Sequence, residues 1–466
     1  MNLTFNDKKV AILGMGEAGM SAARWLREQG AQVICVDDKA KDDWDKTFVS
    51  WCEESGVECL SSSLGKEIFS KPLDMLVVSP GIPVTHPLVA EANERGIFVV
   101  GELYLASCMW TGPLIGITGT NGKTTTTLLA THLLNETGIT AVCAGNISPP
   151  LFDLFHKNDG KTCAVLEISS FQLEYFPQTH ILNLKKPRFQ AAVCLNVAPD
   201  HLDRHGDMAG YKRAKERLFE YQDNKCVAVL GKGAEDFNVV GQVVMLKDVR
   251  CDESASRLYI PYGNDELEIN ISGWSLNGRH NLENLTAAII CAHSVGSKLQ
   301  QIEKALGSFV PPSHRLETIG VYNGITFIDD SKATNLHALI TGLKSLEEDV
   351  VLIAGGRAKG EDFSNFGKIL ASIGNGTGAK IRGLVLIGES ATEMAQSVKG
   401  YFKTVVVIQG QSGQEVMEKA VVEAGSMAKK GDVVVLSPAC ASFDMFSNYK
   451  ERGQAYRQGV EKAFNN

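Results

Sequence analysis

Short apolar runs recur along the chain, and most of them end in a glycine-rich or polar turn that leads into a helix-like stretch. In the first hundred residues these runs are 10–13, 33–36 and 75–78. Strands buried on both faces of a parallel sheet are continuously apolar, whereas strands with one solvated face alternate between apolar and polar residues. The pattern therefore predicts parallel strands that alternate with covering helices, as in a doubly wound α/β fold.

The same pattern returns twice more along the chain. A central part begins near residue 101 and contains the runs 113–115, 164–168 and 191–196. The sequence Val310-Pro311-Pro312 breaks the pattern. A third part follows, with the runs 325–328, 350–354, 383–387, 405–408 and 433–436. A length of 466 residues also favours about three domains. We predict three doubly wound α/β domains in series: Rossmann-like at 1–101, P-loop ATPase-like at 102–311 and Rossmann-like at 312–466.

A glycine-rich loop opens the central part and reads Gly116-Ile117-Thr118-Gly119-Thr120-Asn121-Gly122-Lys123-Thr124-Thr125. Glycines allow successive backbone N–H groups to turn toward an anion, and the helix that follows directs its positive end to the same place. Lys123 would reach the terminal phosphates, and the Thr124 hydroxyl would bind Mg²⁺. Ile117 stands where the strict Walker pattern has its first glycine, so this loop is a variant. It predicts a protein that binds a nucleoside triphosphate.

A second glycine-rich turn, Gly14-Met15-Gly16-Glu17-Ala18-Gly19, follows the first strand, and Asp37-Asp38 end the next strand. Such a turn typically places a diphosphate at a helix N-terminus and an acidic residue beside a ribose. Ser79 begins another turn at the carboxyl edge of the same predicted sheet, where open parallel sheets bind ligands. These features also fit an NAD-dependent dehydrogenase, but that function leaves the loop at 116–125 unexplained. A protein that uses the loop only as a nucleotide-controlled switch is a further alternative.

Polar residues follow later strands of the central part as well. Glu167 lies at the end of a buried strand after the phosphate loop, a position that favours binding of Mg²⁺. His201 lies beside Asp200 and Asp203 after another strand, which favours a role as a ligand. Lys215 has the local pattern of one charge on a solvated helix face.

Two loops of the third part carry similar chemistry. Asp330-Ser331-Lys332-Ala333-Thr334-Asn335 follows one strand, and Ser437-Pro438-Ala439-Cys440-Ala441-Ser442-Phe443-Asp444 follows another. A turn of small residues exposes backbone N–H groups and hydroxyls, which suits a substrate that carries a carboxylate. The two loops lie at equivalent edges of the predicted sheet, each after the carboxyl end of a strand.

Composition narrows the class of protein. Hydrophobic residues make up 44% of the chain and charged residues 21%, which is ordinary for a globular protein. A net charge of −8 disfavours a nucleic-acid partner. The 11 cysteines are dispersed, as expected for thiols in a reducing cytoplasm. No apolar run approaches the ~20 residues that span a bilayer, and the polar first residues do not form a signal peptide. We expect a cytoplasmic protein without a membrane partner, and a monomer.

Taken together, these residues resemble the Mur ligase family, the ATP-dependent amide-forming enzymes of peptidoglycan precursor synthesis. The resemblance covers essentially the whole chain and is most specific at residues 119–124, 166–174, 278–281, 314–317 and 330–335. The loop at 437–444 points to the member that joins D-glutamate to UDP-N-acetylmuramoyl-L-alanine. A family member that adds a different amino acid, such as L-alanine or a diamino acid, is the alternative.

The resemblance also implies roles for individual residues. The UDP-sugar would be bound by Gly14, Met15, Gly16, Glu17, Asp37, Asp38, Ser79 and Asn146. ATP would be bound by Gly119, Thr120, Asn121, Gly122, Lys123, Thr124, Thr125, Asn281, Asn284, Arg315, Asp330 and Lys332. Glutamate would be bound by Thr334, Lys359, Ser442, Phe443 and Tyr449. The catalytic group would consist of Lys123, Glu167, His201 and Lys215.

By the same resemblance the enzyme would use two Mg²⁺ ions, held by Thr124, Glu167, His201 and Lys215. Lys215 matches the family lysine that CO₂ carbamylates, which converts an ammonium into an anionic group. ATP would phosphorylate the alanyl carboxylate, and the glutamate amine would then attack the acyl phosphate. The third domain would close over the others to exclude water. One departure is Ser148-Pro149-Pro150, where the family commonly has a glycine after Gly145-Asn146-Ile147. We expect this substitution to stiffen the loop.

Overall fold

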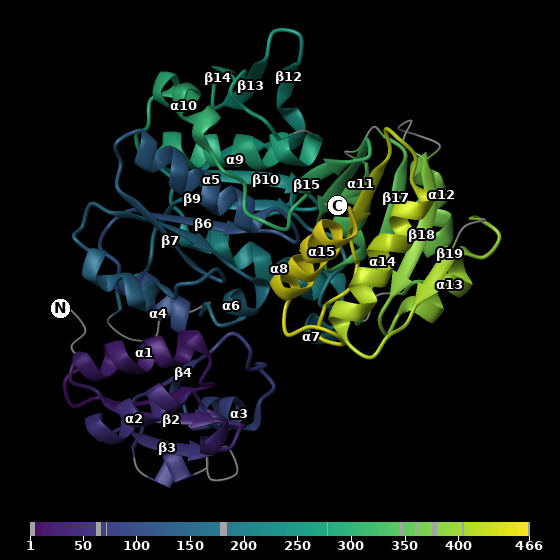
Figure 1. Ribbon diagram of the computed structural model, residues 1–466. Helices are drawn as coiled ribbons and strands as arrows, with labels where there is room; N and C mark the ends of the chain where they lie inside the picture. Colours follow the sequence, from purple (N-terminus) through teal and green to yellow (C-terminus); the bar gives the residue numbers. More distant parts are fainter. Residues whose placement is uncertain are drawn as a thin grey trace. The chain divides into compact units, whose positions relative to one another are not determined.

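A computed structural model describes residues 5–61, 67–70, 72–177, 184–276, 278–344, 346, 348–358, 362–374, 380–402 and 405–464. Its first sheet has the strand order β3-β2-β1-β4-β5, and every pairing is parallel. The strands are β1 (Lys9–Leu13), β2 (Gln32–Asp37), β3 (Glu58–Ser61), β4 (Met75–Val78) and β5 (Phe98–Gly101). The intervening helices are α1 (Glu17–Glu28), α2 (Lys46–Ser55) and α3 (Pro87–Glu94), with a 3₁₀ turn at Lys41–Asp43. This is the predicted Rossmann-like arrangement (Figure 1).

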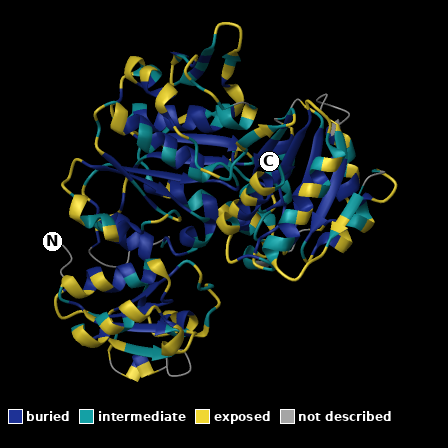
Figure 2. Cartoon of the chain, in the orientation of Figure 1, coloured by how far each residue is buried: buried dark blue, intermediate teal, exposed yellow. Residues whose placement is uncertain are grey.

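The second sheet is also parallel, with the order β11-β10-β9-β6-β8-β7. Its strands are β6 (Leu114–Thr118), β7 (Ala141–Gly145), β8 (Cys163–Glu167), β9 (Phe189–Asn196), β10 (Val227–Lys232) and β11 (Gln242–Met245). The α-helices of this part are α4 (Glu102–Met109), α5 (Lys123–Glu136), α6 (Ser170–Glu174), α7 (Leu202–His205), α8 (Met208–Glu216), α9 (Arg279–Val295) and α10 (Leu299–Ala305). The 3₁₀ helices are Leu151–Lys157, Arg217–Tyr221, Leu246–Asp248 and Leu306–Ser308. Strands β6 and β8 are wholly buried, as their continuous apolar pattern predicts (Figure 2).

The third sheet has the order β15-β16-β20-β17-β18-β19. Its strands are β15 (Glu317–Tyr322), β16 (Ile325–Asp329), β17 (Val350–Gly355), β18 (Ile381–Ile387), β19 (Val405–Ile408) and β20 (Val433–Leu436). Its helices are α11 (Leu336–Leu343), α12 (Phe366–Gly374), α13 (Ala391–Val398), α14 (Gly413–Met427) and α15 (Tyr449–Phe464). Helices α11 to α13 enclose one hydrophobic core and helices α14 and α15 another, so both faces of the sheet are covered.

Two features go beyond the predicted doubly wound pattern. An additional antiparallel sheet consists of β12 (Arg250–Asp252), β13 (Arg257–Tyr262) and β14 (Asp265–Asn270). Strand β15 also pairs antiparallel with β16, at the edge of the third sheet. Both additions are charged or half exposed, so they lack the continuous apolar run that identified the parallel strands.

The chain's own contacts divide it into two compact units. The first comprises residues 1–197, 207–275 and 283–309, and the second comprises 198–206, 276–282 and 310–466. Within the first unit a single core runs from the first sheet to the second, where Trp25 stacks on Phe152 at 4.7 Å between ring centroids. The domain boundaries at 101/102 and 311/312 stay predictions. No helix in the described part of the chain is long and apolar enough to cross a membrane.

Candidate active site

The phosphate loop joins buried strand β6 to helix α5. Gly119 has φ 146° and Gly122 has φ 85°, so the chain turns twice through backbone conformations that favour glycine. A Cβ atom at Gly122 would lie 2.3 Å from Oδ1 of Asn284 and 2.9 Å from Cδ1 of Leu195. The loop is therefore packed too closely for a side chain at this point, where it leads into the N-terminus of α5.

Two lysines converge on this loop. Nζ of Lys123 donates to the carbonyls of Gly119 and Thr120 at 2.9 Å each. Nζ of Lys215 donates to the same Gly119 carbonyl at 3.0 Å and lies 4.4 Å from the centroid of the Tyr211 ring. Lys215 is only 1% exposed, so its assignment to a solvated helix face was wrong. Two ammonium groups at one carbonyl, beside a helix N-terminus, form a positive centre suited to a polyphosphate.

The local sequence pattern gave the wrong environment for Lys215 because helix α8 carries one buried lysine and one surface lysine. Lys212 lies on the same helix as Lys215, is half buried and pairs with Asp236 at the surface. Only the packing of α8 against the loop separates the two side chains. The family resemblance had singled out Lys215, and the structure places it at the phosphate loop.

Glu167 ends strand β8 between β6 and β7, opposite Ile117 on one side and Gly145 on the other. It is 3% exposed, and its Oε1 accepts a hydrogen bond of 2.7 Å from Nδ2 of Asn146. Its other oxygen, Oε2, is buried without a hydrogen-bond partner among the described residues. A buried carboxylate oxygen without a donor is costly, and a hard cation is the kind of ligand that would satisfy it.

Sequence reasoning gave no role to Asn196, at the end of β9. Its Oδ1 accepts from the backbone N of Asn121 at 2.9 Å, and its Nδ2 donates to the Asn121 carbonyl at 3.2 Å. Its own carbonyl accepts from the N of Thr120 at 2.9 Å. Asn196 therefore holds the phosphate loop in place from the neighbouring strand. The sequence signal that could have identified it is an amide side chain at the end of β9, the strand that pairs with β6 before the phosphate loop.

The two asparagines of α9 that are predicted to bind ATP fall in different places. Oδ1 of Asn284 accepts from the Thr126 hydroxyl at 3.2 Å, which fixes α9 against α5 beside the loop. Asn281 lies one turn earlier, and its backbone N donates to the Gly278 carbonyl. Asn281 belongs to the second compact unit, and Asn284 to the first. Thr125 is buried in the first turn of α5.

The first domain brings its predicted residues together at the glycine-rich turn. The N of Met15 donates to Oδ2 of Asp37 at 2.5 Å, and the hydroxyl of Ser79 donates to the Gly14 carbonyl at 2.6 Å. Gly19 packs closely against the start of the turn, since a Cβ at Gly19 would lie 1.9 Å from the Gly14 oxygen. The turn is thus held by both strands that flank it.

The neighbouring acids contact other residues. Oδ1 of Asp38 lies 3.2 Å from Nε2 of His86, while Asp37 accepts the hydrogen bond from the turn. Glu17, in the first turn of α1, accepts from the Ser148 hydroxyl at 2.6 Å. The unusual Ser148 loop therefore contacts the helix whose N-terminus is expected to face the sugar nucleotide.

In the second unit, Asp330 follows β16 and is 7% exposed. Its Oδ2 accepts from the Ser437 hydroxyl at 2.9 Å, and its Oδ1 accepts from the Leu316 N at 3.3 Å. Burial raises the pKa of Asp330 to about 7, although the Ser437 hydrogen bond and the nearby Arg315 both favour the charged form. The loops at 330–335 and 437–444 are therefore in direct contact.

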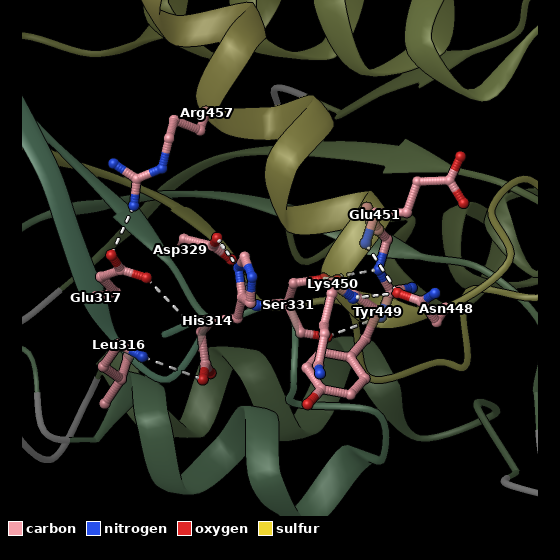
Figure 3. A network of polar contacts seen from close by, with 12 residues as sticks. His314, Leu316, Glu317, Asp329, Ser331, Asn448, Tyr449, Lys450, Glu451 and Arg457 are labelled. Atoms are coloured by element: carbon pink, nitrogen blue, oxygen red, sulfur yellow. Dashed lines mark hydrogen bonds and ion pairs between the residues drawn. The ribbon is translucent and has the colours of Figure 1, made fainter. Parts of the chain in front are cut away.

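A polar network lies beside this acid (Figure 3). Nδ1 of His314 lies 2.6 Å from Oδ2 of Asp329, and the His314 N donates to Oε2 of Glu317 at 2.9 Å. Arg457 donates to the other oxygen of Glu317 at 2.6 Å. The histidine and the two acids come close enough to share a cation. However, the contacts with Arg457 and with the histidine already use both acids, so we interpret the group as a hydrogen-bond network.

Arg452 is a second residue that sequence reasoning missed. It is fully buried on α15, and its guanidinium donates to Oγ and O of Ser331 at 3.1 and 2.9 Å. It also donates to the carbonyls of Cys440 and Ala441 at 3.0 and 3.2 Å. One side chain thus fastens both candidate substrate loops. Arg452 belongs to no sequence motif, and a lone arginine in a polar helix usually faces solvent, so sequence reasoning gave it no role.

The remaining predicted residues of the second unit differ in exposure. Ser442 is buried, and its carbonyl accepts from the N of Phe446, whereas Phe443 is 62% exposed. Nζ of Lys332 lies 3.9 Å from the centroid of the Tyr449 ring. The backbone of Thr334 donates to the Lys332 carbonyl.

His201 and Lys359 are two further predicted site residues. His201 caps α7 with φ 54°, and its Nε2 lies 3.7 Å from Asp200. Oδ1 of Asp200 is buried without a hydrogen-bond partner among the described residues. Lys359 lies outside the described residues. The functional roles of all these residues stay predictions.

Comparison with known proteins gives consistent similarity along the chain. Residues 8–101 match the model "Mur ligase MurD-like, N-terminal domain", residues 117–292 the "Mur ligase middle domain", and residues 314–440 the "Mur ligase, glutamate ligase domain". The UDP-N-acetylmuramoylalanine--D-glutamate ligase of Caldicellulosiruptor saccharolyticus is 35% identical over 98% of this chain and 99% of its own length. That of Desulfitobacterium hafniense is 36% identical over 100% and 99%. A pseudomurein peptide ligase type C from Methanothermus fervidus shares the fold, with a TM-score of 0.56, 18% identity and coverage of 98% and 100%.

Proposed function

Because the chain belongs to the Mur ligase family, we propose that it joins D-glutamate to UDP-N-acetylmuramoyl-L-alanine at the expense of ATP. The reaction is a step of peptidoglycan precursor synthesis. The observation that carries the proposal is the phosphate loop, where Lys123 donates to the carbonyls of Gly119 and Thr120 at the N-terminus of α5. Similarity to D-glutamate ligases over the full length supports the choice of amino acid.

We infer that Mg²⁺ accompanies ATP, as in other Mur ligases. The Thr124 hydroxyl and the unpartnered Oε2 of Glu167 are the groups that would hold one ion. His201 and a carbamylated Lys215 would hold a second. When bound, the metal offsets the negative charge of the phosphates. A histidine that binds metal cannot accept a proton at the same nitrogen, so we assign His201 as a ligand rather than a base.

The chain's own residues support an acyl-phosphate route. A carboxylate is a poor electrophile, so the alanyl carboxylate would first take the γ-phosphoryl group of ATP. Lys123 is placed to offset charge as that group moves, which is mainly a matter of position and electrostatics. The neutral amine of glutamate would then attack the acyl carbon and expel phosphate. Closure of the third domain would exclude water from this intermediate.

The substrates would be bound at separate glycine-rich or polar turns. We assign the uridine diphosphate to the turn held by Asp37 and Ser79. We assign the glutamate to the loop around Ser442, next to the loop that carries Asp330. Since ATP and uridine nucleotides are cytoplasmic metabolites, we place the enzyme in the cytoplasm. We also propose that it acts as a monomer, which light scattering coupled to gel filtration would test.

The first experiment measures phosphate release from ATP in the presence of UDP-N-acetylmuramoyl-L-alanine. D-Glutamate, L-glutamate and other amino acids are compared. We expect release only with D-glutamate. Release with another amino acid instead would mean that the enzyme is a Mur ligase with a different amino-acid substrate. Absence of release with every amino acid would contradict the proposed function.

A variant tests the role of Glu167. Glu167→Gln keeps the shape and the contact with Asn146 but removes the charge, so we expect phosphate release to fall by about 100-fold or more. Glu136→Gln, at the exposed end of the same domain's helix α5, is the control and should keep full activity. Activity of Glu167→Gln within about twofold of wild type would remove this residue from the site.

Carbamylation of Lys215 has its own test. We expect activity to decline when CO₂ and bicarbonate are removed at alkaline pH, and to return when bicarbonate is added. Lys215→Ala should be inactive and indifferent to bicarbonate. Full activity of the wild-type enzyme in CO₂-free buffer would show that the unmodified ammonium suffices.

A further inference from the structure

Three cysteines of the first domain lie together and have no part in the proposed reaction. Cys35 on β2 and Cys59 on β3 are register partners in a parallel strand pair, and Cys52 lies on α2, which packs over the same face. Cys35 and Cys52 are fully buried. Cys59 is partly exposed because β3 is the edge strand of the sheet. The site thus combines one accessible thiol with two inaccessible thiols.

The geometry allows a covalent link between the strands. Neighbouring strands lie about 4.8 Å apart, and disulfides join Cα atoms separated by about 4.4–6.8 Å. Register partners on adjacent strands direct their side chains to the same face of the sheet. Cys35 and Cys52 belong to one hydrophobic core, and Cys59 packs against that core. The register of β2 and β3 therefore places Cys35 and Cys59 at about the Cα separation that a disulfide spans.

The charges around Cys59 favour its thiolate. The neighbouring Cys35 thiol holds the pKa of Cys59 below its usual range, and Cys52 and the ammonium of Lys41 act in the same direction. Partial burial and Glu53, which is 2.9 Å from Lys41, act in the opposite direction. The neighbouring thiols of Cys52 and Cys59, together with burial, raise the pKa of Cys35. Nucleophilic thiolate therefore forms at the one thiol of the three that solvent reaches.

We propose that Cys35, Cys52 and Cys59 form an oxidation site at which a hydroperoxide converts Cys59 and Cys35 into a disulfide. The Cys59 thiolate attacks the outer peroxide oxygen, the O–O bond breaks, and the leaving oxygen departs as hydroxide or alkoxide and takes up a proton. The Cys35 thiol then attacks the sulfenic sulfur of Cys59. The S–S bond forms as the sulfenic hydroxyl leaves with the Cys35 proton as water. Two thiols are oxidised and one peroxide is reduced.

The disulfide would form close to the predicted nucleotide turn. Cys35 precedes Asp37 by two residues, so both side chains lie on the same face of β2. Asp37 in turn accepts the hydrogen bond from Met15. The thiol chemistry itself does not depend on the ligase activity, so its test stands apart from that of the proposed function.

The experiment treats the fully reduced, full-length protein with hydrogen peroxide at a one-to-one ratio. Remaining thiols are alkylated, and unreduced peptides are mapped by mass spectrometry. We expect a disulfide between residues 35 and 59, and oxidation of Cys59 at least about tenfold faster than that of Cys251, a partly exposed cysteine on β12. Oxidation of Cys59 no faster than that of Cys251 would overturn the proposal.

Variants separate the roles of the three thiols. Cys59→Ser should abolish the disulfide. Cys35→Ser should abolish it too, but should leave a sulfenic acid at Cys59 that dimedone labels. Cys52→Ser and Cys251→Ser should keep the disulfide, and far-UV circular dichroism of each variant verifies the fold. A disulfide between residues 52 and 59, or one that survives Cys35→Ser, would overturn the assignment of Cys35 as the resolving thiol.

Discussion

Asp330 is a carboxyl group whose protonation depends on its surroundings. It is buried beside Ser437 and Leu316, and its pKa is raised to about 7. An acid with a raised pKa binds its proton more tightly in the folded state than in the unfolded state. Its contribution to stability is therefore fully present below the unfolded pKa, near 3.8, and is lost as the pH rises through about 7.

We predict that Asp330→Asn reduces the pH dependence of stability. Relative to this variant, the wild-type free energy of unfolding should fall by up to about 4 kcal/mol between pH 4 and pH 8. Urea unfolding of both proteins across this range, without ligands, measures the difference. Glu393→Gln, at an exposed position on α13, is the control and should show no such trend. A constant difference between Asp330→Asn and wild type would mean that Asp330 titrates normally.

Arg452 is the residue on which both substrate loops of the second unit depend. Its guanidinium serves four acceptors in the interior, on Ser331, Cys440 and Ala441. We predict that Arg452→Lys lowers the free energy of unfolding by about 2–4 kcal/mol, because a single ammonium cannot reach all four acceptors and leaves buried carbonyls unpaired.

The same helix provides a matched control for this prediction. Arg457, one and a half turns later, is partly exposed and pairs with Glu317. Arg457→Lys should therefore cost less than about 1 kcal/mol. Denaturant unfolding of both variants tests the difference. Equal losses would show that the buried contacts of Arg452 contribute little.

At the scale of elements, the phosphate site depends on how the turn enters helix α5. The helix begins at Lys123, directly after Gly122 in a left-handed conformation, and ends before Gly138 in a similar one. The two glycines have φ values of 85° and 86°. A Cβ at Gly122 would clash with Asn284, whereas a Cβ at Gly138 would meet open space.

We predict different outcomes for alanine at these two positions. Gly138→Ala should cost about 1 kcal/mol of stability from backbone strain alone and should leave nucleotide binding intact. Gly122→Ala adds a clash with Asn284 and should weaken ADP binding by at least about tenfold. Thermal unfolding and calorimetric titration with ADP measure both effects. Equal ADP affinity in the two variants would show that the loop tolerates a side chain.

At the scale of the whole molecule, predicted substrate residues lie in both compact units. Lys123 and Glu167 belong to the first unit, and Asp330 and Ser442 belong to the second. We predict that a non-hydrolysable ATP analogue together with the sugar nucleotide brings the two units closer and reduces the radius of gyration in small-angle X-ray scattering. Either ligand alone provides the comparison. Scattering profiles that are the same with and without the ligand pair would contradict domain closure.

Local patterns sufficed for the parallel strands and for the phosphate loop. Strands β4, β19 and β20 have the bounds that the apolar runs predicted, because a strand buried on both faces must be apolar throughout. The loop was identified because glycines, a lysine and hydroxyls at fixed spacing are a local requirement of phosphate binding. The antiparallel strands β12 to β15 were missed because their half-exposed residues carry no such pattern.

The sequence by itself therefore determined the fold class, the nucleotide loop and, through family resemblance, the expected reaction. Only the tertiary structure decided which of two lysines on α8 is buried at the loop, which aspartate after β2 holds the glycine turn, and which arginine of α15 fastens two loops. The physical reason is that burial and hydrogen-bond partners arise between segments far apart in the chain. Lys215 reaches back 96 positions to Gly119, and no window of sequence contains both.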